Sequence, residues 1–377
     1  MRCDAVNRGF REVKLAREGN VPLQQSIRYL KTRDGVRIAW ASSGEGPPLV
    51  KAANWLTHLN YDLESPLWRH WIEFLGSHFR LIRYDERGCG MTDWHVGDLT
   101  PARWSEDLEA VIEASDPGER FVVLGVSQGA AAAIGYAVRH PERISRMILY
   151  GGYAAGWAHR ADSEALRRYR AMIELIRHGW GKDNPVFRQL FTSMFVPEAR
   201  PEQLDWFNEL CRRTTTPEIA CRLFESRGEA DVRPLLSQVR VPTLVVHARH
   251  DEVVPFSAGK LLATEIPGAE FVELDSRNHV LLADEPAWER FKEVVLDYTG
   301  RRAQPAAEDP RLAALSERER EILAALIAGR SNSEIGAALF ISEKTVRNSL
   351  TRIFEKLGVR TRTQAAVLAR DCGFAGS

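Results

Sequence analysis

The sequence predicts a large α/β domain with a mostly parallel sheet, followed by a small all-α domain. Two observations support this order. Short apolar runs alternate with helix-like segments over most of the first 300 residues, which is typical of βα units on a parallel sheet. The last 67 residues contain only helical patterns, and a short segment with two prolines, 300–310, precedes them as a linker. A chain of 377 residues is long enough for each domain to have its own core.

The α/β domain is expected to span residues 26–299, after a polar arm at 1–25. It opens with two strands that flank Asp34 and Gly35, a dipeptide that favours a hairpin turn. The stretch 152–230 is helical in pattern and rich in aromatic residues, as expected of a cap over a cleft. Six further strands are expected at 48–53, 80–84, 121–125, 146–150, 242–247 and 270–274.

The segment 121–137 combines an apolar strand, the pattern GVSQG at 125–129 and an alanine-rich helix. A serine between two glycines on a sharp strand-to-helix turn is typical of a nucleophile elbow, which places Ser127 above the sheet. Asp251 and His279 each follow a later predicted strand. The pattern therefore predicts a serine, aspartate and histidine at one edge of the sheet.

These residues and their chain order resemble the α/β-hydrolase family. The resemblance covers about residues 26–299 and includes RYDERGCGMTDW at 83–94, which is similar to the family's aspartate-arginine-glycine loop. It is closest to the hydrolase-like modules that are fused to signalling domains such as bacterial nucleotide cyclases. The resemblance implies that Ser127 is a nucleophile, that His279 is its general base and that Asp251 holds the imidazole tautomer.

The same resemblance implies an oxyanion hole made of two backbone N–H donors. One donor is expected from Gln128, directly after the serine. The other is expected from Trp55, because Ala53-Asn54-Trp55 stands where the family usually has His-Gly and then the donor residue. We expect the missing glycine to affect turnover more than ligand binding.

The segment 311–377 carries successive helical patterns, with a helix-sized run that opens at Ser331 and a short turn at 340–341. Ser342 then offers a capped start for a further helix, which has one apolar and one cationic face. Such a helix is suited to the major groove of DNA. Its apolar face is Val346, Leu350, Ile353, Phe354 and Leu357, and its opposite face is Lys344, Arg347, Asn348, Thr351, Arg352 and Lys356.

The run from Leu315 to Arg370 resembles the LuxR-type (GerE-like) helix-turn-helix. The resemblance implies binding to double-stranded promoter DNA, as a homodimer on paired half-sites. It assigns base reading to Arg347, Asn348 and Thr351, and Ser349 stands where the family commonly has histidine. It assigns phosphate contacts to Lys344, Thr345, Arg352 and Lys356.

The last predicted helix, at about 363–371, offers a small-residue surface. This surface suits either close pairing of two copies or simple packing on the preceding helix. Its members are Ala365, Ala366, Val367 and Ala369.

Composition narrows the class of protein. Basic and acidic residues balance at 51 each, but residues 311–377 carry a surplus of four positive charges, which favours local contact with DNA. The five cysteines lack paired spacing, and His247 and His250 beside Asp251 have no third ligand with suitable spacing, so we expect no metal and no cofactor. No secretory signal and no membrane-length apolar run is evident, so we expect a soluble, cytoplasmic protein without membrane contact.

Two functions remain open from the sequence. In the first, the chain is a transcriptional regulator whose hydrolase-fold domain senses a small, largely apolar ligand under the cap. In the second, it is an active serine hydrolase, an esterase or lactonase, and hydrolysis generates or ends the signal. The cap aromatics are compatible with a ligand cage or with plain core packing.

Overall fold

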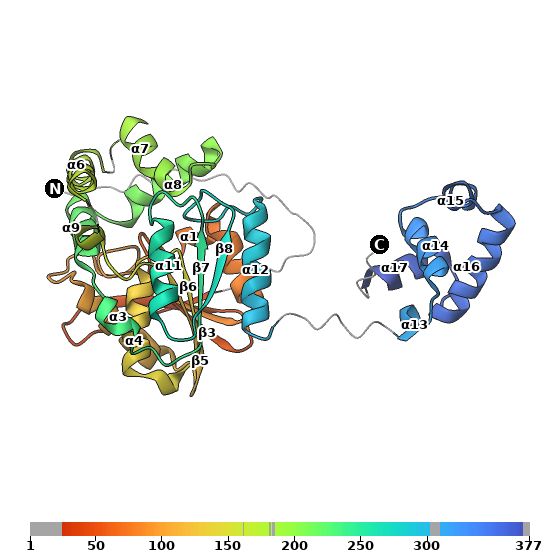
Figure 1. The fold of residues 1–377 in the computed structure, drawn as a ribbon, viewed down its shortest axis with the longest axis horizontal. Helices are drawn as coiled ribbons and strands as arrows, with labels where there is room; N and C mark the ends of the chain where they lie inside the picture. Colours follow the sequence, from red (N-terminus) through yellow and green to blue (C-terminus); the bar gives the residue numbers. More distant parts are fainter. Residues whose placement is uncertain (1–24, 161, 181, 183–184, 302–309, 372–377) are drawn as a thin grey trace, which may run out of the picture. The chain divides into compact units, whose positions relative to one another are not determined.

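The structure is a computed structural model. It describes residues 25–160, 162–180, 182, 185–301 and 310–371. Contacts within the chain divide it into two compact units, Met1–Gly300 and Arg301–Ser377, each with its own hydrophobic core (Figure 1). The predicted fold class, an α/β domain followed by a small all-α domain, is confirmed. Nearly all of the expected arm and linker lie outside the described residues.

The first unit contains an eight-stranded sheet in the order β1-β2-β4-β3-β5-β6-β7-β8. β1 and β2 form the expected hairpin, β2 and β4 are also antiparallel, and the other neighbours are parallel. The strands are β1 Gln25–Lys31, β2 Arg37–Ser43, β3 Pro48–Ala52, β4 Arg80–Tyr84, β5 Phe121–Val126, β6 Ile144–Tyr150, β7 Thr243–Ala248 and β8 Glu270–Leu274.

Helices cover both faces of this sheet (Figure 1). Because the central strands are buried on both sides, their sequences are continuous apolar runs instead of alternating ones. One face carries α3 (Pro101–Ser115), α4 (Gly129–Arg139) and α11 (Phe256–Glu265), and the other carries α2 (Arg69–His78) and α12 (Pro286–Tyr298). Short helices in the connections are α1 (Tyr61–Glu64), η1 (Pro141–Arg143) and α10 (Arg233–Leu236).

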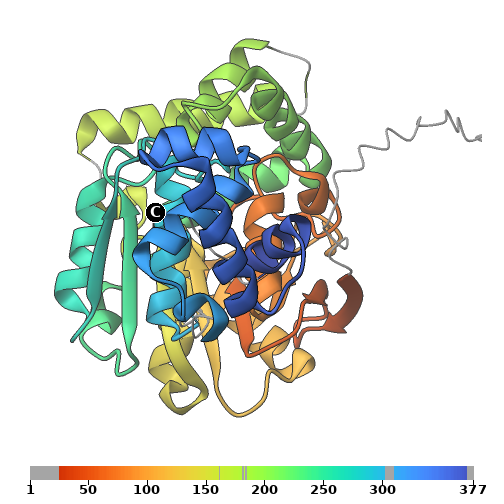
Figure 2. The same ribbon diagram turned by 90° about the vertical axis from the view of Figure 1, so that its right-hand side faces the viewer.

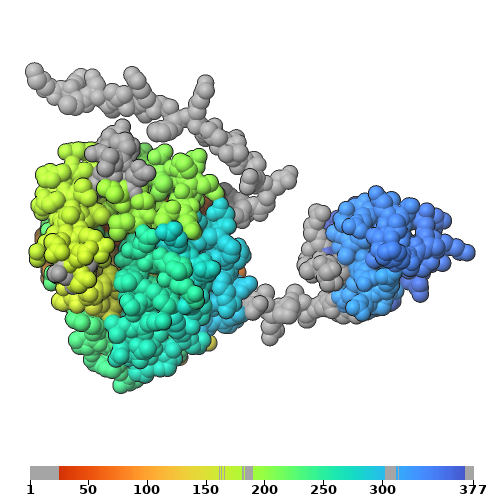
Figure 3. All heavy atoms as spheres, turned by 45° about the horizontal axis from the view of Figure 1, so that its top comes forward, coloured from red at the N-terminus to blue at the C-terminus, as the bar shows by residue number. Residues whose placement is uncertain are grey.

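The helical stretch between β6 and α10 forms the cap. In both ribbon views its helices gather beyond one end of the sheet, and in the space-filling view the yellow-green cap atoms form the surface at that end (Figures 2 and 3). Three of the helices begin with proline, whose fixed φ and missing N–H suit the first helical position. The cap helices are α5 Trp157–Arg160, α6 Ser163–Gly179, α7 Pro185–Phe195, α8 Pro201–Thr214 and α9 Pro217–Glu229.

Three helices of the second unit, α14, α15 and α16, begin at serine caps. The hydroxyls of Ser316, Ser331 and Ser342 each accept the backbone N–H three residues on, which satisfies a free donor at the helix start. Phe340, with φ of 56°, ends α15 and forms the turn before α16. The helices are α13 Pro310–Ala313, α14 Glu317–Ile327, α15 Asn332–Leu339, α16 Glu343–Leu357 and α17 Arg362–Asp371.

Candidate active site and nucleic-acid interface

Ser127 lies on the turn between β5 and α4, where its backbone is left-handed with φ of 53°. A non-glycine residue in this conformation costs on the order of 1–3 kcal/mol, so the surrounding structure must hold it there. The flanking glycines make the turn possible. A Cβ on Gly125 would lie 2.7 Å from Ala130 Cα, and one on Gly129 would lie 2.9 Å from the Ala53 carbonyl oxygen. The local geometry is therefore that of a nucleophile elbow.

Asp251 and His279 form a buried pair, with His279 Nδ1 and Asp251 Oδ2 2.6 Å apart. The other carboxylate oxygen accepts the backbone N–H groups of Val253, at 2.8 Å, and Val254, at 2.9 Å. His247 does not compete strongly for this carboxylate, because its Nε2 lies 3.9 Å from Asp251 Oδ2 and 3.0 Å from the Val254 carbonyl. A carboxylate fixed on both oxygens can hold an imidazole in one orientation and tautomer.

The Gly151-Gly152 turn after β6 lies against all three predicted catalytic residues. A Cβ on Gly151 would be 3.2 Å from His279 Cε1, and one on Gly152 would be 3.7 Å from the Ser127 carbonyl oxygen. His279 Nε2 is buried, and it has no hydrogen-bond partner in the described part of the chain. The structure thus pairs Asp251 with His279, and the Gly151-Gly152 turn contacts both this pair and Ser127. No hydrogen bond joins the side chains of Ser127 and His279.

Trp55 and Gln128 lie at the same edge of the sheet, because they follow the parallel neighbours β3 and β5. Among the residues described, neither backbone N–H donates to a protein acceptor. Leu56 has a left-handed φ of 56°, so the loop after β3 turns sharply without a glycine. Two unused N–H groups beside a nucleophile elbow are what an oxyanion hole requires.

The cap contacts the site through Phe195, the last residue of α7. Its carbonyl accepts the His279 backbone N–H at 2.8 Å, and the two rings are 5.7 Å apart between centroids. Trp55 packs on the cap as well, with ring centroids 5.7 Å from Trp180 and 5.9 Å from Phe191. His279 is only 2% exposed, so the cap shields the site from bulk water.

A second buried group, here called the elbow–cap network, consists of Glu86, Gln128 and Arg227. Gln128 Nε2 donates to Glu86 Oε1 at 2.6 Å, and Arg227 Nε, from cap helix α9, donates to Gln128 Oε1. The Arg227 guanidinium lies 3.5 Å from the centroid of the Trp55 ring. Burial raises the pKa of Glu86 to about 7 and lowers the pKa of Arg227 to about 10.

The sequence did not single out Glu86 or Arg227, and it marked Phe195 only as one of the cap aromatics. For Glu86 a signal existed, because it stands within the segment 83–94 that resembles the aspartate-arginine-glycine loop. Arg227 carries no local signal, because its partner Gln128 is distant in the sequence. The contact between Phe195 and His279 was not predictable for the same reason.

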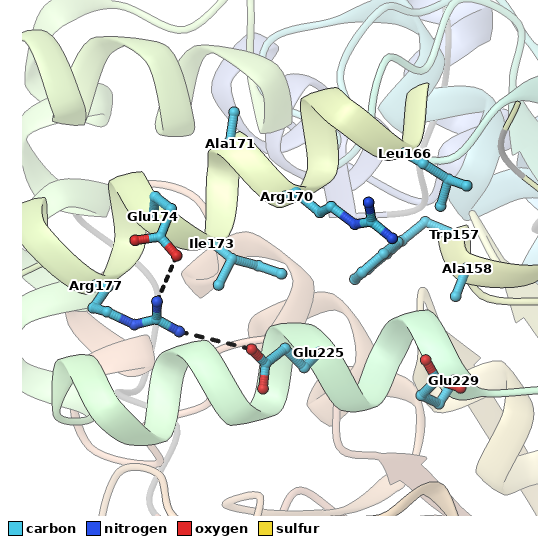
Figure 4. A pocket seen from close by; sticks show the side chains of 10 residues that line it. All are labelled: Trp157, Ala158, Leu166, Arg170, Ala171, Ile173, Glu174, Arg177, Glu225 and Glu229. Atoms are coloured by element: carbon cyan, nitrogen blue, oxygen red, sulfur yellow. Dashed lines mark hydrogen bonds and ion pairs between the residues drawn. The ribbon is translucent and has the colours of Figure 1, made fainter. Parts of the chain in front are cut away.

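The cap also carries a groove of about 710 Å³ between α5, α6 and α9 (Figure 4). At one end, Arg177 lies 2.5 Å from Glu174 and 3.9 Å from Glu225, as the dashed lines show. No predicted catalytic or oxyanion residue lines this groove, so it is separate from the Ser127 site. Its lining residues are Trp157, Ala158, Leu166, Arg170, Ala171, Ile173, Glu174, Arg177, Glu225 and Glu229.

In the second unit, α16 separates its two predicted faces as expected. The apolar residues are buried in the domain core, except Phe354, which is half-buried. All seven predicted DNA-contacting side chains are exposed: Lys344, Thr345, Arg347, Asn348, Thr351, Arg352 and Lys356. Ser349, which stands at the family's histidine position, is instead buried.

Of the four basic side chains in this set, Arg347 and Lys356 have partners among the described residues of the domain. Lys356 Nζ donates to Glu319 Oε2 at 2.6 Å and to the Ala314 carbonyl at 3.0 Å, which ties the end of α16 to α14. Arg347 pairs with Glu343 at 3.0 Å on the open helix surface. An exposed pair of this kind is weak and is easily exchanged for a DNA contact.

The small residues of α17 are divided between core and surface. Ala365 and Ala369 are fully buried in the domain core, whereas Val367 is 50% exposed. Packing on the neighbouring helices therefore accounts for two of the four residues, and a pairing surface on α17 would depend on Val367 and Ala366.

Across the described ranges, no helix is long and apolar enough to cross a membrane. In the same residues, no group of three or more histidine, cysteine or acidic side chains is placed to hold a metal ion. Cys89, Cys211 and Cys221 are buried free thiols, and the remaining two cysteines lie outside the described residues.

Comparison with known proteins agrees with this division of the chain. Residues 72–286, more than half of the chain, match the family model described as "Serine aminopeptidase, S33". Residues 313–369 match the model described as "Bacterial regulatory proteins, luxR family".

Individual relatives cover the first unit. The AB hydrolase superfamily protein YisY from Bacillus subtilis is 28% identical over 67% of this chain and 91% of its own length. A hydrolase from Pseudomonas aeruginosa has a TM-score of 0.60 and 26% identity, and the match covers 73% of this chain and 98% of that one. An esterase from Exiguobacterium antarcticum, also with a TM-score of 0.60, is 23% identical over 72% of this chain and 98% of its own, which shows the fold alone.

Proposed function

Since the chain belongs to the family described as serine aminopeptidase, S33, within the α/β hydrolases, and carries a LuxR-type DNA-binding domain, we propose that it is a ligand-responsive transcriptional regulator. The observation that carries the proposal is the fusion itself. A capped hydrolase site and a DNA reader on one chain are useful together when occupancy of the site changes DNA affinity. The regulator would bind promoter DNA as a homodimer on paired half-sites.

The ligand is proposed to be a small molecule that is apolar over most of its length and binds beneath the cap. Trp55, Trp180, Phe191 and Phe195 form a buried aromatic group next to His279, which supports this placement. Since the cap helix α7 ends on the His279 backbone, a ligand that moves the cap also moves this residue. A ligand can act as a switch only if it binds one position of the cap more tightly than the other.

The second candidate function is a serine hydrolase, an esterase or lactonase. It is favoured by the strained Ser127 elbow and by the 2.6 Å contact between Asp251 and His279. In this mechanism Ser127 Oγ attacks a carbonyl carbon while His279 Nε2 takes its proton, and the oxyanion is held by the N–H groups of Trp55 and Gln128. The Asp251 carboxylate stabilises the imidazolium that forms.

One experiment distinguishes the two functions. Fluorescence anisotropy on promoter DNA would follow the ligand response of wild type and Ser127→Ala. For a receptor, Ser127→Ala loses one hydrogen bond of about 0.5–1.5 kcal/mol, so the dose response shifts by roughly tenfold or less. A Ser127→Ala protein that folds and binds ligand, yet no longer changes its DNA affinity, would rule out the pure receptor and make covalent chemistry part of the switch.

A further inference from the structure

Two arginines of the cap helices, Arg160 and Arg227, each have a buried guanidinium nitrogen without a partner among the described residues. Arg227 is 8% exposed, and its Nη2 makes no hydrogen bond within the described residues. Arg160, at the end of α5, has a buried Nη1 that is also unpaired across the described ranges. A buried guanidinium nitrogen left unpaired is costly, because desolvation is not offset by any acceptor.

The surroundings of these two arginines place them near the elbow. Arg227 reaches Gln128 and the Trp55 ring, as described above. Arg160 lies over the ring of Tyr153, with 5.1 Å from its guanidinium carbon to the ring centroid. Tyr153 is buried and directly follows the Gly151-Gly152 turn that contacts the predicted catalytic residues.

Acidic side chains do not neutralise this positive charge fully. Glu86 is the acid nearest to Arg227, but its Oε2 lies 3.8 Å from Nη2, which is too long for a hydrogen bond. Oε2 itself is also unpartnered. Arg160 forms no ion pair with any described residue. Arg160 and Arg227 therefore offer positive charge and free N–H donors beside the aromatic rings of Tyr153 and Trp55.

We propose that the ligand bound beneath the cap carries a carboxylate, which Arg160 and Arg227 hold beside Tyr153. A guanidinium donates paired N–H groups that match the two oxygens of a carboxylate. The remainder of the ligand is apolar and packs on the aromatic residues of the cap. This inference rests on the proposed function, because it names the chemical class of the ligand that the regulator binds.

The test uses the full-length Ser127→Ala protein, in which no acyl transfer occurs. Calorimetry compares hexanoate with hexan-1-ol, two probes of equal chain length that differ in the charged group. Hexanoate is expected to bind at least about tenfold more tightly, because hydrogen bonds to charged groups are the stronger ones. Equal binding of the two probes, or no detectable binding of either, overturns the proposal.

Substitution of Arg160 then tests whether the preference for hexanoate over hexan-1-ol depends on the two arginines. Arg160→Met removes no hydrogen bond seen in the structure, so it should fold, and it is expected to weaken hexanoate roughly 10- to 150-fold and leave hexan-1-ol unchanged. Arg168→Met, an exposed arginine on α6, is the matched control and should bind both probes as the parent does. Thermal unfolding confirms that each variant is folded. An unchanged hexanoate preference in Arg160→Met contradicts the assignment.

The outcome is separable from that of the proposed function. If hexanoate binds selectively and promoter affinity does not change, the regulatory proposal fails while the carboxylate site stands. If promoter affinity responds to a neutral ligand and hexanoate has no advantage, the carboxylate site fails while regulation stands.

Discussion

Charged side chains at the two candidate sites of the chain lie in opposite surroundings. Around the elbow, Glu86 and Arg227 are buried and held by Gln128. On helix α16, Arg347 and Arg352 are exposed. Buried charges are little affected by salt but strongly affected by pH, whereas exposed charges on a DNA-reading face behave in the reverse way. The two regions therefore make different, separable predictions.

The largest expected effect concerns the buried site. If His279 activates Ser127, wild type should react with a fluorophosphonate, and His279→Ala should lower the labelling rate by about a thousandfold or more, because a neutral serine hydroxyl is a poor nucleophile. Mass spectrometry locates and quantifies the label. His95→Ala, an exposed histidine outside the site, is the control and should label normally. Equal labelling of His279→Ala and wild type would remove His279 from the chemistry.

The next prediction concerns the pKa of Glu86, which burial raises and the charge of Arg227 lowers. Its pKa is about 7 in the folded chain, against an ordinary value of 4.5. Between pH 4.5 and 7, the folded state therefore keeps a proton on Glu86 that the unfolded state has released. The contribution of Glu86 to stability is thus fully present below pH 4.5 and is lost as the pH rises through 7. The loss is on the order of 3 kcal/mol for a shift of this size.

Glu86→Gln should remove this part of the pH dependence, although other buried acids such as Asp62 and Asp85 keep theirs. All ten tryptophans lie before residue 300, so tryptophan fluorescence during denaturant unfolding follows the first unit within the full chain. Parallel pH profiles for wild type and Glu86→Gln would show that Arg227 keeps Glu86 ionised, contrary to the burial argument.

The sequence predicts the two regions to different extents, because one depends on local signals and the other on contacts between distant residues. Helix caps and apolar periodicity are local signals, so the limits of α16 and its exposed face follow from Ser342 and from the spacing of Val346 and Leu350. The strands and the elbow are likewise marked by short patterns. The elbow–cap network is not, because Gln128 and Arg227 are 99 positions apart and meet only after the cap folds over the sheet.

The structure also shows a packing role for residues to which their sequence position alone assigned a binding role. Ala365 and Ala369 fit a pairing surface by their size, yet they fill the core of the second unit. Lys356 fits a phosphate contact by its position, yet it is bound to Glu319. In both cases the residue types are compatible with two uses, and only the packing of α14, α16 and α17 distinguishes them.

A smaller effect is expected at the exposed face. Arg347→Ala should weaken binding to the cognate promoter by about 1–3 kcal/mol and relax the preference at one base pair. Loss of the Glu343 pair itself should matter little, since the pair is exposed. Binding to a panel of single-base variants of the promoter measures this. A uniform loss across all variants would assign Arg347 to the phosphate backbone.

The smallest effect separates two cations on the same helix, Arg352 and Lys356. Arg352 forms no ion pair with the residues described, so it is free to contact a phosphate, and Arg352→Ala should lower the salt dependence of DNA binding by about one counterion. Lys356 must first leave Glu319 and the Ala314 carbonyl, so Lys356→Ala should change the salt dependence less.

Lys356→Ala should instead destabilise the second unit, by about 0.2–1 kcal/mol for the lost ion pair, while Arg352→Ala should not. Calorimetric unfolding and salt titrations of DNA affinity on the same two full-length variants separate these roles. If Lys356→Ala lowers the salt dependence as much as Arg352→Ala and leaves stability unchanged, the contact with Glu319 gives way to DNA. In that case, the exposed face of α16 includes Lys356 as the sequence predicts.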